Sequence, residues 1–156
     1  MKREQGYTLI EMLIALSLMM ILSAGGLYGW QNWQRQQRLW QTASQVRDFL
    51  SMLRNDANWY ARDRLPRQEG GAHGWCLNAA IPAQTGCDAQ NRFVLRPLWP
   101  EVMLSDITPA LGFYGLRNTA WPGHIILKSG ADSWTLVVSN WGRVRLCKGS
   151  SDRGCQ

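Results

Sequence analysis

The chain has 156 residues, enough for one compact domain with an appendage and too few for two full domains. Hydrophobic residues make up 46% and charged residues 18%, a globular composition whose apolar share is concentrated at one end. The formal net charge of +6 comes mostly from scattered arginines, which favours a solvated basic surface over a nucleic-acid or anionic-lipid site.

The first expected element is an apolar helix near the N-terminus. Residues 7–28 form a 22-residue segment, and about 20 residues are needed to cross ~30 Å of hydrocarbon as a helix. Lys2 and Arg3 precede this segment, so the positive-inside rule keeps the N-terminus in the cytoplasm. We therefore expect a single-pass protein whose globular part lies outside the cytoplasm.

Glu11 lies one turn inside this apolar segment. A buried acidic side chain costs roughly 2.5–3.5 kcal/mol at the centre of a span and less near its end. The side chains one turn away on the same helix carry no positive charge. The nearest candidate cation is a new α-amino group on Tyr7, which cleavage after Gly6 would expose in this chain or in an adjacent one.

The run Gly6-Tyr7-Thr8-Leu9-Ile10-Glu11, followed by an apolar helix, resembles the signature of type IV prepilins. The resemblance implies that a prepilin peptidase cleaves after Gly6 and methylates the amino group of Tyr7. The glutamate of that family corresponds to Glu11, which would neutralise the amino terminus of a neighbouring subunit. Such a pair adds little net stability but penalises any stacking offset that leaves one charge alone.

Two other interpretations of the N-terminus compete with this one. A secretory signal peptide could be cut beside the small residues 23–25. In a signal peptide, however, Glu11 would weaken membrane insertion and no favourable interaction would compensate for it. The segment could also be an uncleaved membrane anchor.

The helical pattern continues beyond the apolar segment. Its apolar stripe recurs in steps of four and three, over Leu39, Ala43, Val46, Leu50, Leu53 and Ala57. Residues 7–65 contain no proline, and Pro66 with two glycines predicts a stop. A helix continuous to about Ala61 would run ~80 Å, with Gly25, Gly26 and Gly29 as its most flexible point.

Beyond residue 71 the sequence predicts short β-strands separated by turn residues. They cover residues 74–77, 92–96, 111–114, 124–128, 134–139 and 143–147, and Ser139-Asn-Trp-Gly142 predicts a hairpin turn between the last two. The expected fold is α+β, with the long N-terminal helix packed on an antiparallel sheet. The expected parts are a leader (1–6), a transmembrane helix (7–30), an amphipathic half (31–66) and a β-rich domain (67–156).

Four cysteines lie beyond the apolar segment, and an even number in an exported chain favours disulfides. Of the three connectivities we favour Cys76 with Cys87 and Cys147 with Cys155, because each closes a short polar loop. A zinc site is the alternative, but the cysteine spacing does not match a zinc knuckle and the two histidines are isolated.

The nine tryptophans exceed what a core of this size needs. Trp30 and Trp33 follow the apolar run, where tryptophan anchors at a membrane interface. The others, from Trp59 to Trp141, are expected to divide between the core and subunit contacts.

Motifs of catalysis are missing from the sequence, which has no phosphate loop, no His-Glu-x-x-His and no Gly-x-Ser-x-Gly. We therefore expect no enzyme activity, no cofactor and no catalytic or structural metal; the chain itself is the substrate of the peptidase.

The resemblance extends to residues 30–43, 53–59, 115–121 and 145–147, which are similar to prepilin peptidase-dependent minor pilins akin to the H-type pseudopilins. It implies a low-abundance subunit that primes or caps a pilus. Its partners would be the peptidase, other minor and major pilins, the inner-membrane assembly platform and membrane lipid, with its β-rich domain in the periplasm. Many major pilins have a helix-kinking proline where this chain has Tyr28 and glycines.

Two alternative functions remain at the sequence level. A DNA-binding minor pilin would use basic residues near the C-terminus to neutralise phosphates, namely Arg143, Arg145, Lys148 and Arg153. A minor pseudopilin of type II secretion would carry the same N-terminal signature.

Overall fold

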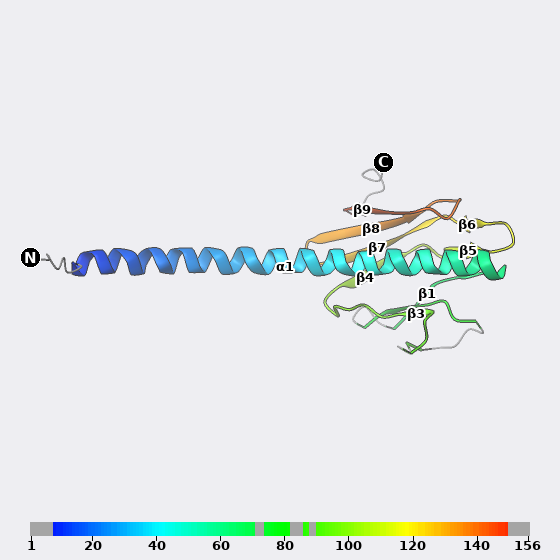
Figure 1. Cartoon of the computed structure of the whole chain (residues 1–156), viewed down its shortest axis with the longest axis horizontal. Coiled ribbons are helices and arrows are strands. Elements are labelled where there is room, and N and C mark those ends of the chain that lie inside the picture. Colours follow the sequence, from blue (N-terminus) through cyan, green and yellow to red (C-terminus); the bar gives the residue numbers. More distant parts are fainter. Residues whose placement is uncertain (1–7, 71–73, 82–85, 88–89, 150–156) are drawn as a thin grey trace, which may run out of the picture. The chain divides into compact units, whose positions relative to one another are not determined.

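The computed structural model describes residues 8–70, 74–81, 86–87 and 90–149, with the backbone alone for residues 27 and 28. It divides into two compact units, Met1–Arg35 and Gln36–Gln156. In chain order the elements are α1 (Leu9–Tyr60), β1 (Arg67–Glu69), β2 (Cys76–Asn78), β3 (Val94–Leu95), β4 (Met103–Ile107), β5 (Gly112–Tyr114), β6 (Thr119–Trp121), β7 (Gly123–Ser129), β8 (Asp132–Val138) and β9 (Val144–Lys148) (Figure 1).

Within the first unit, α1 is apolar on all sides over residues 12–22, except for Ser17. Its described leucine, isoleucine and methionine side chains are exposed, and the segment is long and apolar enough to cross a membrane. Two hydroxyls in this segment bond to their own helix: Ser17 Oγ donates to the Ile14 carbonyl at 2.8 Å and Ser23 Oγ to the Met19 carbonyl at 2.7 Å. The hydroxyls therefore add little cost to placing the segment in lipid or in an apolar protein bundle.

In the second unit, α1 supplies one wall of the core. The stripe expected from the sequence is fully buried, which confirms that prediction, and it packs with apolar residues of all three sheets in one cluster. Leu77 of β2, Phe113 of β5 and Leu136 of β8 represent those sheets. The helix is thus held by burial of its apolar stripe, the usual source of helix stability in proteins.

The strands form three antiparallel sheets where the sequence predicted one. Their orders are β1-β2-β3, β4-β7-β8-β9 and β5-β6. The six expected strands correspond to β2, β3, β5, β7, β8 and β9, with boundaries shifted by a few residues. The strands β1, β4 and β6 were not predicted, because they are short or polar and carry little β-type signal of their own.

The hairpin between β8 and β9 confirms the predicted turn. Val138 pairs with Val144 at its closed end. The Ser139 amide donates to the Arg143 carbonyl at 3.0 Å, and the Gly142 amide donates to the Ser139 carbonyl at 2.8 Å. Gly142 has a φ of +72°, a conformation that glycine adopts without strain.

The helix ends one residue earlier than expected, at Tyr60. Ala61 has a φ of +48°, and the Arg62 amide donates to the Ala57 carbonyl at 3.2 Å, so the chain leaves the helix through a left-handed residue. The expected stop at Pro66 lies several residues further on. The helix C-terminus is therefore set by this local reversal.

One disulfide joins Cys76 to Cys87, with their Cα atoms 5.8 Å apart, which is the pairing favoured from the sequence. It fastens β2 to the loop that follows it. Cys147 is also disulfide-bonded, and Cys155, its expected partner, lies outside the described residues.

Candidate assembly and docking sites

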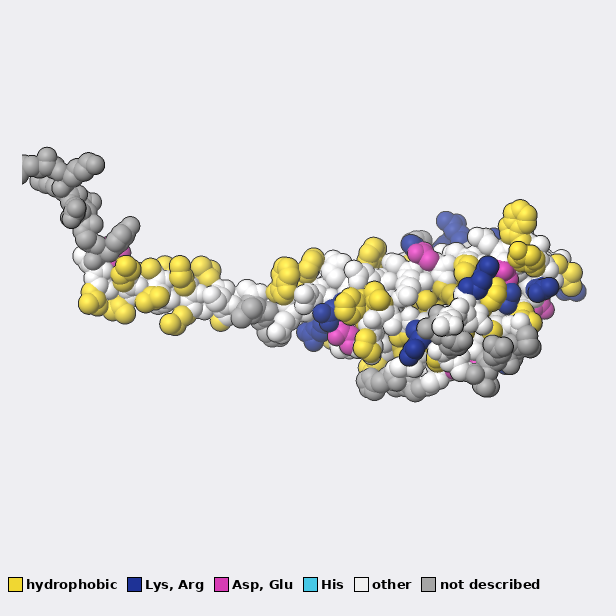
Figure 2. Space-filling view, turned by 60° about the horizontal axis from the view of Figure 1, so that its bottom comes forward, with side chains coloured by type: hydrophobic (Ala, Val, Ile, Leu, Met, Phe, Trp, Pro, Cys, Tyr) yellow, Lys and Arg dark blue, Asp and Glu magenta, His cyan; other side chains and the backbone are white. Residues whose placement is uncertain are grey.

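Glu11 lies in the first turn of α1, where its amide donates to the Thr8 carbonyl at 3.0 Å. Its side chain is exposed and is surrounded by exposed apolar residues such as Ile10 and Leu13. Figure 2 shows the apolar side chains that cover this stretch of the helix. Within the described part of the chain Glu11 forms no ion pair, so its carboxylate is free for a partner outside it. Gly6 and Tyr7 lie outside the described residues.

Trp30 and Trp33 form an aromatic pair further along the first unit. Their ring centroids are 5.3 Å apart and their planes are inclined by 38°. Both side chains are more than half exposed. An amphipathic aromatic pair directly after an apolar span is the arrangement that favours the boundary between lipid and water.

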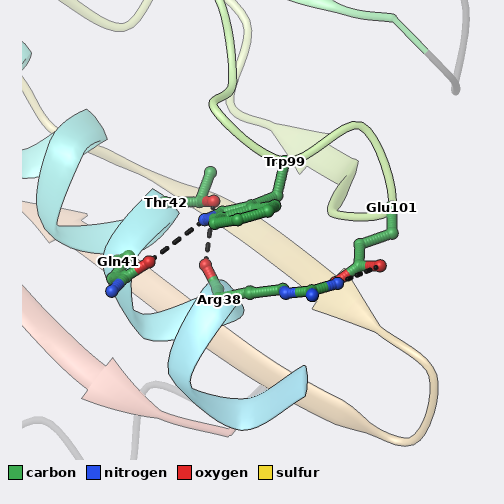
Figure 3. Close-up of polar contacts among 5 residues, drawn as sticks. All are labelled: Arg38, Gln41, Thr42, Trp99 and Glu101. Atoms are coloured by element: carbon green, nitrogen blue, oxygen red, sulfur yellow. Dashed lines mark hydrogen bonds and ion pairs between the residues drawn. The ribbon is translucent and has the colours of Figure 1, made fainter. Parts of the chain in front are cut away.

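In the second unit, Arg38 fastens the loop between β3 and β4 to α1 (Figure 3). Its Nη1 lies 3.1 Å from both carboxylate oxygens of Glu101. The guanidinium carbon lies 4.5 Å from the centre of the Trp99 ring, and Trp99 Nε1 donates to Gln41 Oε1 at 3.1 Å. Because the ion pair is partly exposed, it contributes at most about 1 kcal/mol to this attachment, and the ring contact adds a similar amount.

The basic residues predicted as a DNA contact do not share one face. Arg143 precedes β9, and Arg145 and Lys148 lie on it. Lys148 pairs with Trp134, and both line the same groove as residues of α1, whereas Arg145 pairs with Val137. Strand alternation therefore puts Arg145 and Lys148 on opposite faces of the sheet. Arg153 lies outside the described residues.

That groove has a volume of about 400 Å³. Its lining mixes aromatic, amide and charged side chains, from Gln36, Gln37, Leu39, Trp40, Asp132, Trp134 and Lys148. Lys148, which was expected to contact DNA, thus shares this groove with Asp132, and the aspartate reduces its attraction for phosphate.

The fold brings His124 between a hydroxyl and a carboxylate, a contact that the sequence did not reveal. His124 Nε2 lies 2.9 Å from Asp106 Oδ2, and its Nδ1 lies 3.2 Å from Thr108 Oγ1. Thr108 Oγ1 also accepts the His124 amide at 2.9 Å. These bonds tie the end of β4 to the start of β7. Over the described residues, no group of three His, Cys, Asp or Glu side chains could hold a metal ion.

Comparison with known proteins adds one finding to this geometry. The family model described as the prokaryotic N-terminal methylation motif matches residues 1–27. No curated protein and no solved structure matches the chain. The motif, the apolar helix and the α+β fold support a type IV pilin or pseudopilin, anchored in the membrane by one span.

Proposed function

We propose that this chain is a minor type IV pilin, a low-abundance subunit that prepilin peptidase processes and that helps to prime or cap a pilus. The observation that carries the proposal is the methylation motif at residues 1–27 followed by an exposed carboxylate, Glu11, on an apolar helix surface. A subunit that assembles through an apolar helix needs both an exposed apolar surface and a device that fixes its register.

Processing and assembly are coupled through one charge pair. Cleavage after Gly6 creates an amino group on Tyr7, and methylation leaves that group cationic. In the apolar bundle of a filament, Glu11 attracts the amino group of the adjacent subunit strongly, because the effective dielectric constant there is low. A subunit stacked at another height leaves both charges unpaired, which costs several kcal/mol.

The proposed orientation places the N-terminus in the cytoplasm and the second unit in the periplasm. Lys2 and Arg3 support it through the positive-inside rule. The disulfide between Cys76 and Cys87 supports it as well, since disulfides form and persist in the periplasm. Trp30 and Trp33 would then lie at the outer boundary of the inner membrane.

The test compares Glu11→Ala with Ser17→Ala in cells that carry the variant as their sole copy. Ser17 is the matched control, because it is a polar residue of the same apolar segment whose hydroxyl bonds to its own helix. Both variants should be cleaved, and the mass of the mature N-terminal peptide should show a methylated Tyr7. Glu11→Ala should be reduced at least tenfold in sheared filaments, with Ser17→Ala unchanged.

Normal incorporation of Glu11→Ala would refute the role given to Glu11. A mature chain that begins at any residue other than Tyr7 would refute the proposed function as a whole.

The second candidate is a minor pseudopilin of type II secretion, since the same motif occurs in pilins and in pseudopilins. Deletion of the gene separates the two. Loss of surface filaments with normal protein secretion supports the pilin, and the opposite pattern supports the pseudopilin.

A further inference from the structure

The C-terminal end of α1 lies in a surface where four large apolar side chains are exposed. Trp59 and Tyr60, in the last turn of the helix, are 85% and 64% exposed. Leu116, in the turn between β5 and β6, is 85% exposed, and Trp141, in the turn between β8 and β9, is 75% exposed. We call these four residues the end patch.

Backbone contacts bring the three segments of the end patch together. The turn after β5 touches the helix end, since a Cβ on Gly115 would lie 2.1 Å from the Ala57 carbonyl oxygen. The Ala120 amide of β6 donates to the Asn140 carbonyl, in the turn between β8 and β9, at 2.9 Å. Figure 1 shows both turns toward the end of the second unit at which α1 ends. The three segments that carry the end patch therefore lie at the same end of the second unit, although they are far apart in sequence.

Three arginines surround the end patch. Arg62, Arg117 and Arg143 are exposed and belong to the same three segments, in which Asp63 is the acidic residue. In the described part of the chain, none of these three guanidinium groups forms an ion pair. The surface thus combines apolar area with unneutralised positive charge.

The four side chains of the end patch do not contribute to the core of the second unit. The core is filled by other residues, including a fully buried tryptophan, Trp75, whose Nε1 donates to the Val102 carbonyl at 2.8 Å. Exposed apolar side chains that are grouped and bordered by polar residues mark interaction sites. Tryptophan, tyrosine and arginine are also the residue types that dominate protein–protein binding energy.

The end patch borders a concave groove on the surface. Trp59 and Tyr60 form part of its lining, and its volume is about 580 Å³. The lining also includes Met52, Arg92 and two aspartates, Asp48 and Asp56, each of which is paired with an arginine. A flat ring system next to a concave site can accept a protruding side chain, which is the geometry of an interface anchor.

We propose that the end patch is a docking surface for a different protein, whose contacting face combines apolar side chains with carboxylates. A second copy of this chain fits poorly, because a symmetric contact would bring the same arginines together. DNA fits poorly as well, since the exposed centre of the surface is apolar rather than a continuous basic track. The docking surface goes beyond the proposed function. Only the expectation that the partner is another filament subunit rests on the proposed function.

The test is photo-crosslinking of the full-length chain in cells that make the assembly machinery. A benzophenone amino acid replaces Leu116 or Trp141, and the control replaces Leu98, an exposed leucine in the loop between β3 and β4. Adducts are identified by mass spectrometry. The expected result is one protein adduct from positions 116 and 141, crosslinked within a net-acidic segment and at least fivefold more abundant than from position 98.

Charge reversal then tests the recognition itself. Arg117→Glu with Arg143→Glu should lower the adduct yield at least fivefold, because like charges then face the partner. Arg96→Glu, an exposed arginine near the control position, should leave the yield unchanged.

Four results would overturn the docking surface: no adduct above the Leu98 control, an adduct with a second copy, an adduct with nucleic acid, or a yield that charge reversal does not change. The mass of the mature N-terminus is measured in the same samples. Normal processing without an adduct rejects the docking surface alone. An unprocessed chain that still gives the acidic adduct keeps the surface and rejects the proposed function.

Discussion

Arg64 donates from both Nε and Nη2 to one oxygen of Asp56, each at a distance of 2.7 Å. The two side chains are 5% and 4% exposed. Arg64 also donates from Nη1 to the Ala79 carbonyl at 3.1 Å, and its guanidinium carbon lies 3.7 Å from the centre of the Phe93 ring. This pair links the last turns of α1 to the small sheet of β1, β2 and β3.

Breaking this pair should destabilise the domain strongly. Arg64→Leu leaves the buried Asp56 carboxylate facing Arg92 alone, at 3.6 Å, and loss of one partner of a buried pair costs about 3–5 kcal/mol. The measurement is urea unfolding of the full chain in detergent, followed by tryptophan fluorescence. Removing both charges, by Asp56→Leu with Arg64→Leu, should cost less than Arg64→Leu alone. Equal losses would show that the charge left behind is not what destabilises the domain.

The disulfide between Cys76 and Cys87 should stabilise the domain by about 2–3 kcal/mol, because it closes a loop with a sequence separation of 11 residues. Replacing both cysteines by serine should lower the free energy of unfolding by that amount. The replaced chain should also lose less stability than the natural one when a reducing agent is added. An unchanged urea midpoint would contradict this prediction.

Gly115 should tolerate no side chain. A Cβ there would lie 2.1 Å from the Ala57 carbonyl oxygen and 2.6 Å from the Arg62 amide nitrogen, both backbone atoms. Gly115→Ala should therefore cost about 1–3 kcal/mol, as overpacking does. Gly29→Ala is the control, because a Cβ at that position meets no atom within 4 Å. The two variants are compared by thermal unfolding, and equal midpoints would contradict the close approach.

The attachment of the β3–β4 loop should depend more on Trp99 than on Glu101. Glu101→Gln removes a partly exposed ion pair and should cost less than about 1 kcal/mol, an effect that high salt further reduces. Trp99→Ala removes a half-buried ring together with its bond to Gln41 and should cost about 1.5–3 kcal/mol. Urea unfolding at low and high salt measures both. A larger loss from Glu101→Gln would reverse this assignment.

Replacing the residue before the proposed cut should stop maturation. Gly6→Trp puts a large side chain where the methylation motif has glycine, so the chain should accumulate at its precursor mass in the membrane. Gly26→Trp is the control, since Gly26 lies in α1, well beyond the proposed cut, at a position with open space around it. Normal cleavage of Gly6→Trp would contradict the assigned site.

Local patterns in the sequence predicted one part of this protein well. The apolar segment, the position of Glu11 within it and the buried stripe from Leu39 to Ala57 all follow from helical periodicity, which needs no knowledge of distant residues. The turn at 139–142 and the pairing of Cys76 with Cys87 follow from spacing over a few residues. The processing motif is likewise a continuous run of residues.

The tertiary structure alone decided what depends on residues far apart in the chain. Trp75 is buried, whereas Trp59 and Trp141 are exposed. Residue type alone does not distinguish these three tryptophans. The tertiary structure also joined Arg64 to Asp56, divided the strands among three sheets and separated Arg145 from Lys148 across β9. Burial and pairing of this kind depend on how the loops bring distant segments together in space. The periodicity within one helix or strand does not predict those contacts.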